Sequence, residues 1–215
     1  MSVTKLNKKT TLFIVLGSIF LTNAVLAELI GVKIFSLESL MGVEPAQINI
    51  LDSFYDFNLT TGVILWPVVF ITTDIINEYY GKDGVKKISY LTATMIVYMF
   101  VIITIATILP PANFWLELNN KSADGSYFNI DFAFTKIYSQ GMGIIVASLF
   151  AFLVGQILDV TVFQYIRKRT SKDKIWLRAT GSTLVSQLVD SFLVLFIAHI
   201  IPPGVNISIC FVPSI

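Results

Sequence analysis

The amino-acid sequence predicts an all-α fold, a polytopic helix bundle integral to a membrane. Hydrophobic residues make up 55% of the 215 residues and charged residues only 13%, whereas a soluble chain carries about 25% charged residues. The mean hydropathy is +0.76. Five separate apolar stretches have the length of about 20 residues that crosses a bilayer as a helix. A soluble protein of this composition could not cover its surface with polar groups, so the lipid bilayer is its expected partner.

The net charge and the content of cysteine and histidine exclude several classes of protein. A formal net charge of +1 does not support electrostatic binding of nucleic acid. One cysteine, Cys210, rules out an internal disulfide framework, and one histidine, His199, leaves few nitrogen ligands for a metal. The sequence contains no nucleotide-binding motif. We therefore expect no metal, no other cofactor and no catalytic site.

Five complete transmembrane helices are predicted, within a single transmembrane domain that covers residues 1–215. Their ranges are 12–35, 59–79, 88–109, 142–166 and 175–201. The first range resembles a cleavable signal peptide, because three lysines precede an apolar run that contains Val25-Leu26-Ala27. The apolar run continues to Phe35, however, and the remaining chain is itself apolar. We therefore expect the first range to be a membrane helix.

The connections between these helices are polar. We expect a polar segment at 36–58, a turn at 81–84, a long loop at 110–140 and a basic hinge at 167–174. Pro202-Pro203-Gly204 ends the fifth helix, and twelve residues, 204–215, follow Pro203. As a helix these twelve residues would reach about 18 Å, whereas the hydrocarbon core is about 30 Å thick. The sequence thus predicts either an odd number of helices with an external C-terminus or a sixth helix that is cut short.

Basic residues are concentrated in alternate connections, which predicts the orientation of the chain. One side of the membrane would collect Lys5, Lys8, Lys9, Lys82, Lys86, Lys87, Arg167, Lys168, Arg169, Lys172, Lys174 and Arg178. The other side would keep Lys33, Lys121 and Lys136 beside seven acidic residues. Lysine and arginine are enriched in the cytoplasmic loops of membrane proteins. We therefore expect a multi-pass membrane protein with a cytoplasmic N-terminus.

Several acidic residues lie within the predicted helices, where charge is costly. Asp74, Asp159 and Asp190 would together cost about 7–10 kcal/mol of insertion free energy if each were left unpaired. Polar side chains can also serve only to join helices. Three acids are more than helix packing requires, so we interpret them as part of a functional site.

The acids in the fourth and fifth helices belong to one repeated pattern. Residues 155–159 (Gly-Gln-Ile-Leu-Asp) and 186–190 (Ser-Gln-Leu-Val-Asp) match in residue type at every position. A spacing of three residues places the amide and the carboxylate of each element on one helix face. In the fifth helix Ser182, Ser186 and Asp190 extend this face at intervals of four. Because the two helices are antiparallel, we expect both elements to face one cavity.

The second helix carries a further polar face, with Trp66-Pro67 predicted to kink it. Glu78 lies nearer the interface than Asp74 and could instead sit among headgroups, and Arg178 is predicted to extend toward lipid phosphate. The predicted substrate-binding residues are Asp74, Gln156, Asp159, Gln187 and Asp190. Stacking or secondary roles are predicted for Trp66, Phe70, Asn23, Glu78 and Ser186.

Carboxylates and amides in a membrane cavity suit a polar, hydrogen-bonding solute. A carboxylate can accept two parallel N–H bonds from a guanine-type edge, and an amide can satisfy the adjacent carbonyl. An aromatic face such as that of Trp66 or Phe70 could stack on a planar base. The same acids could also carry a proton.

Three motifs resemble those of a known family. They are residues 66–81, with Thr73-Asp74-Ile75-Ile76-Asn77-Glu78-Tyr79-Tyr80-Gly81 at their end, then 147–163 and 176–191. In this order they are similar to the signatures of the queuosine precursor transporter family, also called the vitamin uptake transporter family. The resemblance implies a six-helix inner-membrane carrier that imports 7-cyano-7-deazaguanine or 7-aminomethyl-7-deazaguanine for queuosine modification of transfer RNA. The chain departs from the family where the sixth helix would lie.

Two other functions compete with this one. A vitamin-like ligand-binding subunit of an energy-coupling-factor importer would also have about six helices, and its ATPase partners would distinguish it. An intramembrane aspartyl protease also places two acids on neighbouring helices. The Gly-x-Gly-Asp signature of such proteases is missing around Asp159 and Asp190, so we do not expect an enzyme.

Overall fold

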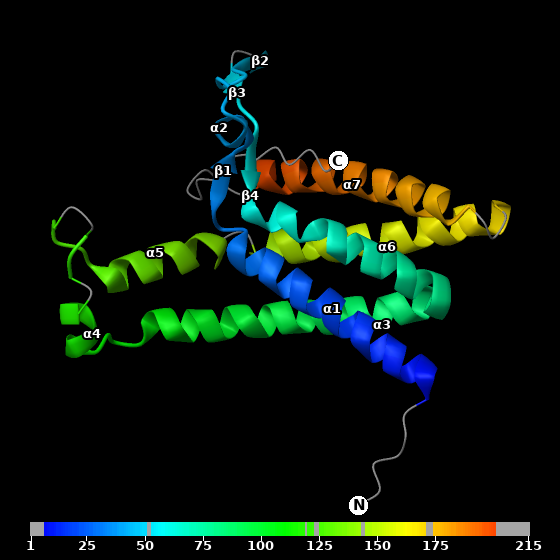
Figure 1. Cartoon of the computed structure of the whole chain (residues 1–215), viewed down its shortest axis with the longest axis horizontal. Helices are drawn as coiled ribbons and strands as arrows, with labels where there is room; N and C mark the ends of the chain where they lie inside the picture. The colour runs from blue at the N-terminus through cyan, green and yellow to red at the C-terminus, as the bar shows by residue number, and fades with distance from the viewer. Residues whose placement is uncertain are drawn as a thin grey trace, which may run out of the picture.

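The computed structural model describes residues 7–50, 53–118, 120–122, 125–142, 145–170 and 174–200. Four long helices form the bundle: α1 (Lys8–Ile30), α3 (Trp66–Ile108), α6 (Ile145–Arg169) and α7 (Ile175–Ile200). Figure 1 shows α6 and α7 side by side as an antiparallel pair, with α1 lying across α3. The molecule is therefore mostly helical, as predicted.

The longest helix, α3, is two helices joined at Gly81. Its 43 residues would reach about 65 Å as one straight helix, about twice the thickness of a bilayer core. Gly81 has φ 67° and ψ −171°, a backbone conformation that is almost restricted to glycine. The chain reverses there, so that the first arm (residues 66–80) and the second arm (residues 82–108) run antiparallel (Figure 1). This reversal falls within the predicted turn at 81–84.

Two helices begin or end at places that differ from the prediction. The first helix ends at Ile30 rather than at residue 35, and the second begins at Trp66 rather than at residue 59. Strand β4 (Asn58–Thr60) and the 3-10 turn η1 (Thr61–Ile64) occupy the residues where the second helix was predicted to begin. Pro67 lies in the first turn of α3, where its missing N–H would be unpaired in any case. The predicted kink at Trp66-Pro67 was therefore wrong.

The remaining predicted helices also differ in detail. The third begins directly after Gly81 rather than at residue 88. The fourth, α6, covers Ile145–Arg169 in place of 142–166, and the fifth, α7, covers Ile175–Ile200. The predicted loop at 110–140 instead contains two helices, α4 (Asn113–Leu118) and α5 (Ile130–Met142). Residues 201–215 lie outside the described residues, and with them the segment 204–215 where the shortened sixth helix was predicted.

Among the described residues, three helical segments are long and apolar enough to cross a membrane. They are Lys8–Ile30, Trp66–Ile108 and Leu149–Arg169. Many large apolar side chains on these helices are exposed, including Ile14, Ile71 and Ile105. Lipid tails solvate such side chains as well as a protein core does. The outward faces of the bundle thus suit a bilayer.

The segment between α1 and α3 forms a small polar structure at one end of the bundle. Strand β1 (Ile34–Ser36) pairs antiparallel with β4, and β2 (Ile48–Ile50) pairs with β3 (Ser53–Tyr55). The short helix α2 (Leu37–Met41) places Glu38 between them. The Glu38 carboxylate accepts hydrogen bonds from the backbone N–H groups of Phe57 (2.6 Å) and Ala46 (3.5 Å) and from the Ser36 hydroxyl (3.0 Å). These bonds, above all that from Phe57, hold the pKa of Glu38 below its ordinary value.

The apolar core lies where α1 and α6 pack on α3. Phe20 and Ala24 of α1 meet Val69 and Ile76 of the first arm, and all four are fully buried. Gly62 lies so close to α1 that an added Cβ would lie 2.7 Å from the Ala27 carbonyl oxygen. This approach fixes the start of α3 against the end of α1.

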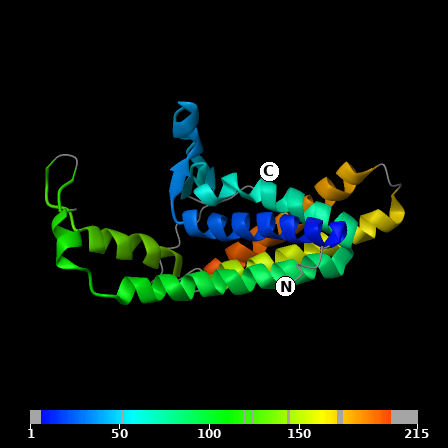
Figure 2. The same cartoon turned by 60° about the horizontal axis from the view of Figure 1, so that its bottom comes forward.

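One end of the molecule collects the basic segments. The start of α1, the reversal within α3, the end of α6 and the start of α7 lie at the same end in two views (Figures 1 and 2). The strands β1 to β4 lie toward the opposite end of α1. The fold thus brings together the described basic residues that the orientation argument assigned to one side of the membrane, whereas Lys5 and Lys172 lie outside the described residues.

Candidate functional site

Polar side chains line the contact between the first arm of α3, α6 and α7. These side chains are buried although the helices that carry them are apolar: Thr73, Asn77, Gln156, Asp159, Arg178, Ser182 and Ser186. A buried polar group is stable only when it has a partner. They belong to two groups: a deep cluster centred on Asp159, and an ion-pair layer around Glu78 that lies nearer the basic end of the bundle.

The deep cluster is centred on Asp159 of α6. This carboxylate is 1% exposed and faces α7. The Ser186 hydroxyl lies 3.4 Å from Asp159 Oδ1, and Ser182 and Thr183 lie near the same carboxylate. Ser182 and Ser186 of the predicted row on the fifth helix therefore lie at the predicted acid of the fourth, whereas Asp190 of that row is not tested.

Asp74 of α3 is the second acid of the deep cluster. It is partly buried and close enough to Asp159 for the two carboxyl groups to interact electrostatically. Among the described residues, its Oδ1 has no hydrogen-bond partner. The two acids thus lie within electrostatic range of each other, and Asp74 Oδ1 is buried without a partner among the described residues.

Gln156 lies beside this cluster but faces another helix. With Ser89 of the second arm of α3, it lines a cavity of about 10 Å³, which is room for about one water molecule. Gln156 Oε1 and Ser89 Oγ have no hydrogen-bond partner among the described residues. The predicted Gln156–Asp159 face is therefore divided between two neighbouring helices.

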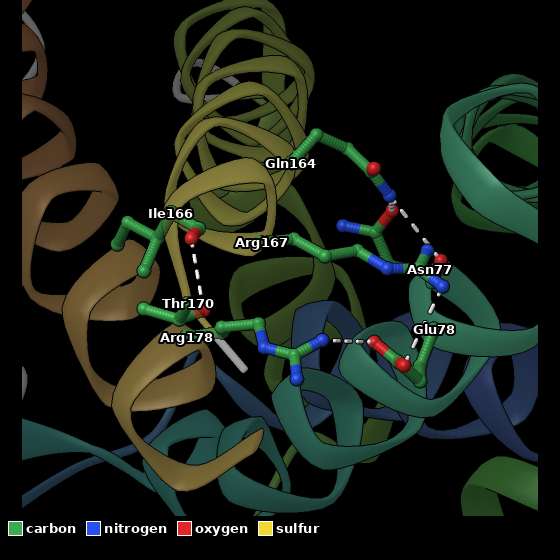
Figure 3. Close-up of polar contacts among 7 residues, drawn as sticks. All are labelled: Asn77, Glu78, Gln164, Ile166, Arg167, Thr170 and Arg178. Carbon is green, nitrogen blue, oxygen red and sulfur yellow. Dashed lines mark hydrogen bonds and ion pairs between the residues drawn. The ribbon is translucent and has the colours of Figure 1, made fainter. Parts of the chain in front are cut away.

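Glu78 connects three helices in the ion-pair layer (Figure 3). Its Oε2 accepts a bond of 2.9 Å from Arg178 of α7, and its Oε1 lies 3.4 Å from Nη2 of Arg167 of α6. Beside it, Gln164 Nε2 donates to Asn77 Oδ1 at 2.6 Å. The Arg178 side chain is only 1% exposed, so the prediction that it extends toward lipid phosphate was wrong.

Arg178 is a residue of this region that the sequence argument missed as part of the cluster. It precedes Ser182 by four residues and Ser186 by eight, and it continues the same row along α7. That spacing could have indicated its inward position. Its partner could not have been found so easily, because Glu78 lies one hundred residues away.

The predicted aromatic residues pack into the core near the start of α3. The rings of Trp66 and Phe70 stack with centroids 5.7 Å apart, and Trp66 also lies 6.3 Å from the ring of Phe152. Asn23, the remaining secondary candidate, donates to the carbonyl of Ile19 in its own helix. The structure brings none of these three into hydrogen-bonding contact with Asp159.

Two predicted substrate-binding residues lie further along α7. Gln187 is partly buried, one position beyond Ser186. The side chain of Asp190 lies outside the described residues. For these two positions the substrate-binding role remains a prediction.

Comparison with known proteins identifies the family. Residues 60–214 match the family model described as "Putative vitamin uptake transporter", as the three motifs predicted. The chain is 29% identical over 158 residues to "Probable queuosine precursor transporter" of Bacillus subtilis (strain 168), which covers 72% of this chain and 63% of that protein. It is 28% identical over 146 residues to "Queuosine precursor transporter" of Escherichia coli (strain K12), which covers 68% and 58%.

A third relative supports the same assignment. "Probable queuosine precursor transporter" of Haemophilus influenzae (strain ATCC 51907 / DSM 11121 / KW20 / Rd) is 26% identical over 144 residues, which covers 67% of this chain and 53% of that protein. The chain therefore aligns with less than two thirds of the length of each relative. No solved structure matches the chain. The match to the family model covers well over half of the sequence, and the chain belongs to the vitamin uptake transporter family.

Proposed function

We propose that this chain imports a queuosine precursor, 7-cyano-7-deazaguanine or 7-aminomethyl-7-deazaguanine, for the queuosine modification of transfer RNA. The family and the names of three relatives support a transporter rather than an enzyme. The observation that carries the proposal is the deep cluster, in which the buried Asp159 carboxylate meets hydroxyls of α7 and the neighbouring Asp74. This cluster is the proposed binding site.

The chemistry of a deazaguanine fits these groups. Its pyrimidine edge presents two parallel N–H donors, which one carboxylate can accept together. Asp159 or Asp74 would supply this acceptor. In a site without bulk water these bonds discriminate strongly, because a ligand that lacks the donors leaves the carboxylate unpaired.

Substrate entry requires the helices to separate. The cavity beside Gln156 has a volume of about 10 Å³, whereas pockets that enclose small organic ligands measure about 300–1,000 Å³. The cavity that Gln156 lines is therefore too small to hold the precursor. A bound precursor would stabilise a second, open arrangement of α3, α6 and α7.

The proposed location is the cell inner (plasma) membrane, with the N-terminus in the cytoplasm. The distribution of lysine and arginine supports this orientation, and the fold collects the basic segments at one end. In this arrangement α1, the two arms of α3, α6 and α7 supply the five predicted membrane crossings.

The alternative function, a ligand-binding subunit of an energy-coupling-factor importer, is not favoured. The relatives are named as transporters of a queuosine precursor. Co-purification with an ATPase pair would reverse this preference.

An uptake experiment tests the proposal. The chain is expressed in a bacterial strain that can neither synthesise nor import a deazaguanine, and queuosine in transfer RNA is measured after the precursor is supplied at low concentration. We expect queuosine to appear with the chain and not with an empty vector. Absence of queuosine, with the chain present in the membrane in normal amount, would refute the function.

A further inference from the structure

Glu78 lies between the deep cluster and the basic end of the bundle. On α3 it follows Asp74 by four residues, one helical turn closer to the reversal at Gly81. On α7, Arg178 precedes Ser182 by four residues and lies in the first turn of the helix. The ion-pair layer is therefore about one turn, or 5.4 Å, nearer the basic end than the deep cluster.

One carboxylate joins all three helices that surround the deep cluster. Glu78 of α3 uses Oε2 for Arg178 of α7 and Oε1 for Arg167 of α6, at 2.9 and 3.4 Å (Figure 3). The Gln164–Asn77 bond of 2.6 Å adds a second link between α6 and α3. Because these links cross both helix contacts, α6 and α7 can separate from the first arm only after they break.

The burial of the three charged groups indicates a barrier rather than a surface ion pair. The exposed fraction of the side chain falls from 37% for Arg167 to 20% for Glu78 and 1% for Arg178. Water therefore reaches the outer arginine but hardly reaches the inner one. Both Glu78 oxygens are already engaged by arginines, so in this conformation Glu78 is not available to a substrate.

We infer that Glu78, Arg167 and Arg178 form the barrier that closes the transport pathway at its basic end. The inference rests on the proposed function, which places the substrate at the deep cluster. Glu78 is a positioning residue in this role: it holds α6 and α7 against α3 in the closed state and releases them when the pathway opens toward the cytoplasm. Removing its charge shifts the equilibrium toward the open state.

The test measures whether water-soluble reagents reach the deep cluster. Ser182→Cys is introduced into a Cys210→Ser background, and membranes of known orientation are treated with a membrane-impermeant, thiol-reactive reagent from each side. Ser182 is fully buried, so the introduced thiol reacts slowly. We expect Glu78→Gln to raise the labelling rate at least about tenfold from the basic side only. Arg167→Gln, which removes the outer link alone, produces a smaller rise.

Matched controls separate opening from unfolding. Arg169→Gln removes an exposed cation two residues from Arg167, and we expect the labelling rate to stay unchanged. Ala24→Cys places a thiol in the fully buried contact of α1 with α3, and this thiol stays protected when Glu78 is replaced. The double variant Glu78→Gln/Arg178→Met leaves no unpaired buried charge, so it folds without that penalty and still raises labelling at position 182.

The outcomes distinguish the barrier from the function. If position 182 stays protected in both Glu78→Gln and the double variant, the barrier is refuted, whatever the uptake experiment shows. If labelling at position 24 rises together with labelling at position 182, general loosening replaces the barrier as the explanation. Increased labelling at position 182 alone supports the barrier. It does so even if no deazaguanine binds, because the lack of binding would refute the proposed function and not the barrier.

Discussion

The substitution Asp159→Asn tests the proposed binding site most directly. The change keeps the shape of the side chain but replaces one acceptor oxygen with an NH₂ donor. The Asp159 carboxylate is 1% exposed and already meets hydroxyls of α7. Water therefore cannot replace a hydrogen bond that the substitution removes, and the full penalty of an unpaired donor applies.

The expected loss follows from two contributions. One charge-assisted hydrogen bond to the deazaguanine is removed, and a new donor faces the second N–H of the ligand. Together these changes cost about 2–4 kcal/mol of binding free energy, which is about a thirtyfold to a thousandfold increase in Kd. Serine hydroxyls can rotate to accept from the new amide, so the helix contact itself survives.

The assay is equilibrium binding of a radiolabelled deazaguanine to membranes that contain equal amounts of each variant. Asp83→Asn is the matched control, because Asp83 is an exposed acid near the reversal of α3, and its Kd should not change. If Asp159 had only a structural role, Asp159→Asn would leave the Kd unchanged, since an amide joins helices as well as an acid does. Unchanged binding by Asp159→Asn would therefore refute Asp159 as the acceptor, and unchanged binding by both Asp159→Asn and Asp74→Asn would refute the proposed site.

Three further predictions address the fold. Gly81→Ala should lower the free energy of unfolding by about 1–3 kcal/mol through backbone strain alone, because an added Cβ would meet nothing within 4 Å; an unchanged thermal midpoint in detergent would contradict the positive φ. The pKa of Glu38 is lower in the folded protein than the value of 4.5 in the unfolded chain. Its carboxylate therefore stabilises the segment around β1 to β4 fully above pH 4.5, and this stabilisation is lost as the pH falls through the lower, folded-state pKa. Limited proteolysis with an acid-active protease should show this pH dependence in the wild type and not in Glu38→Gln. Cysteine labelling should find Ser171→Cys accessible from the cytoplasm and Ser126→Cys from outside, and equal labelling of both from outside would overturn the orientation.

The Asp159–Ser186 contact of the deep cluster could be predicted in part, because helix periodicity determines which side chains share a face. Ser182, Ser186 and Asp159 were selected from intervals of three and four residues, and the structure brings their side chains together. Periodicity does not say which neighbouring helix a face meets. For that reason Gln156 was grouped with Asp159, although its side chain lines a cavity with Ser89 on another helix.

Charged residues at helix ends were harder to interpret. A single arginine near a membrane surface is equally consistent with a lipid phosphate and with a protein acid. The contact between α3 and α7 in the folded structure identifies Glu78 as the partner of Arg178. The start of α3 was also predicted wrongly. Leu59 to Ile64 are apolar enough for a helix, but they form a strand and a 3-10 turn.

The unequal arms of α3 have a consequence for the surrounding lipid. The first arm contains fifteen residues, 66–80, and as a helix it spans about 22 Å, less than the hydrocarbon thickness of about 30 Å. Such a hydrophobic mismatch is relieved when the bilayer thins beside the short helix. The membrane would then be thinnest next to the arm that carries Asp74 and Glu78, and acyl-chain length would become a determinant of how fast a polar solute crosses there.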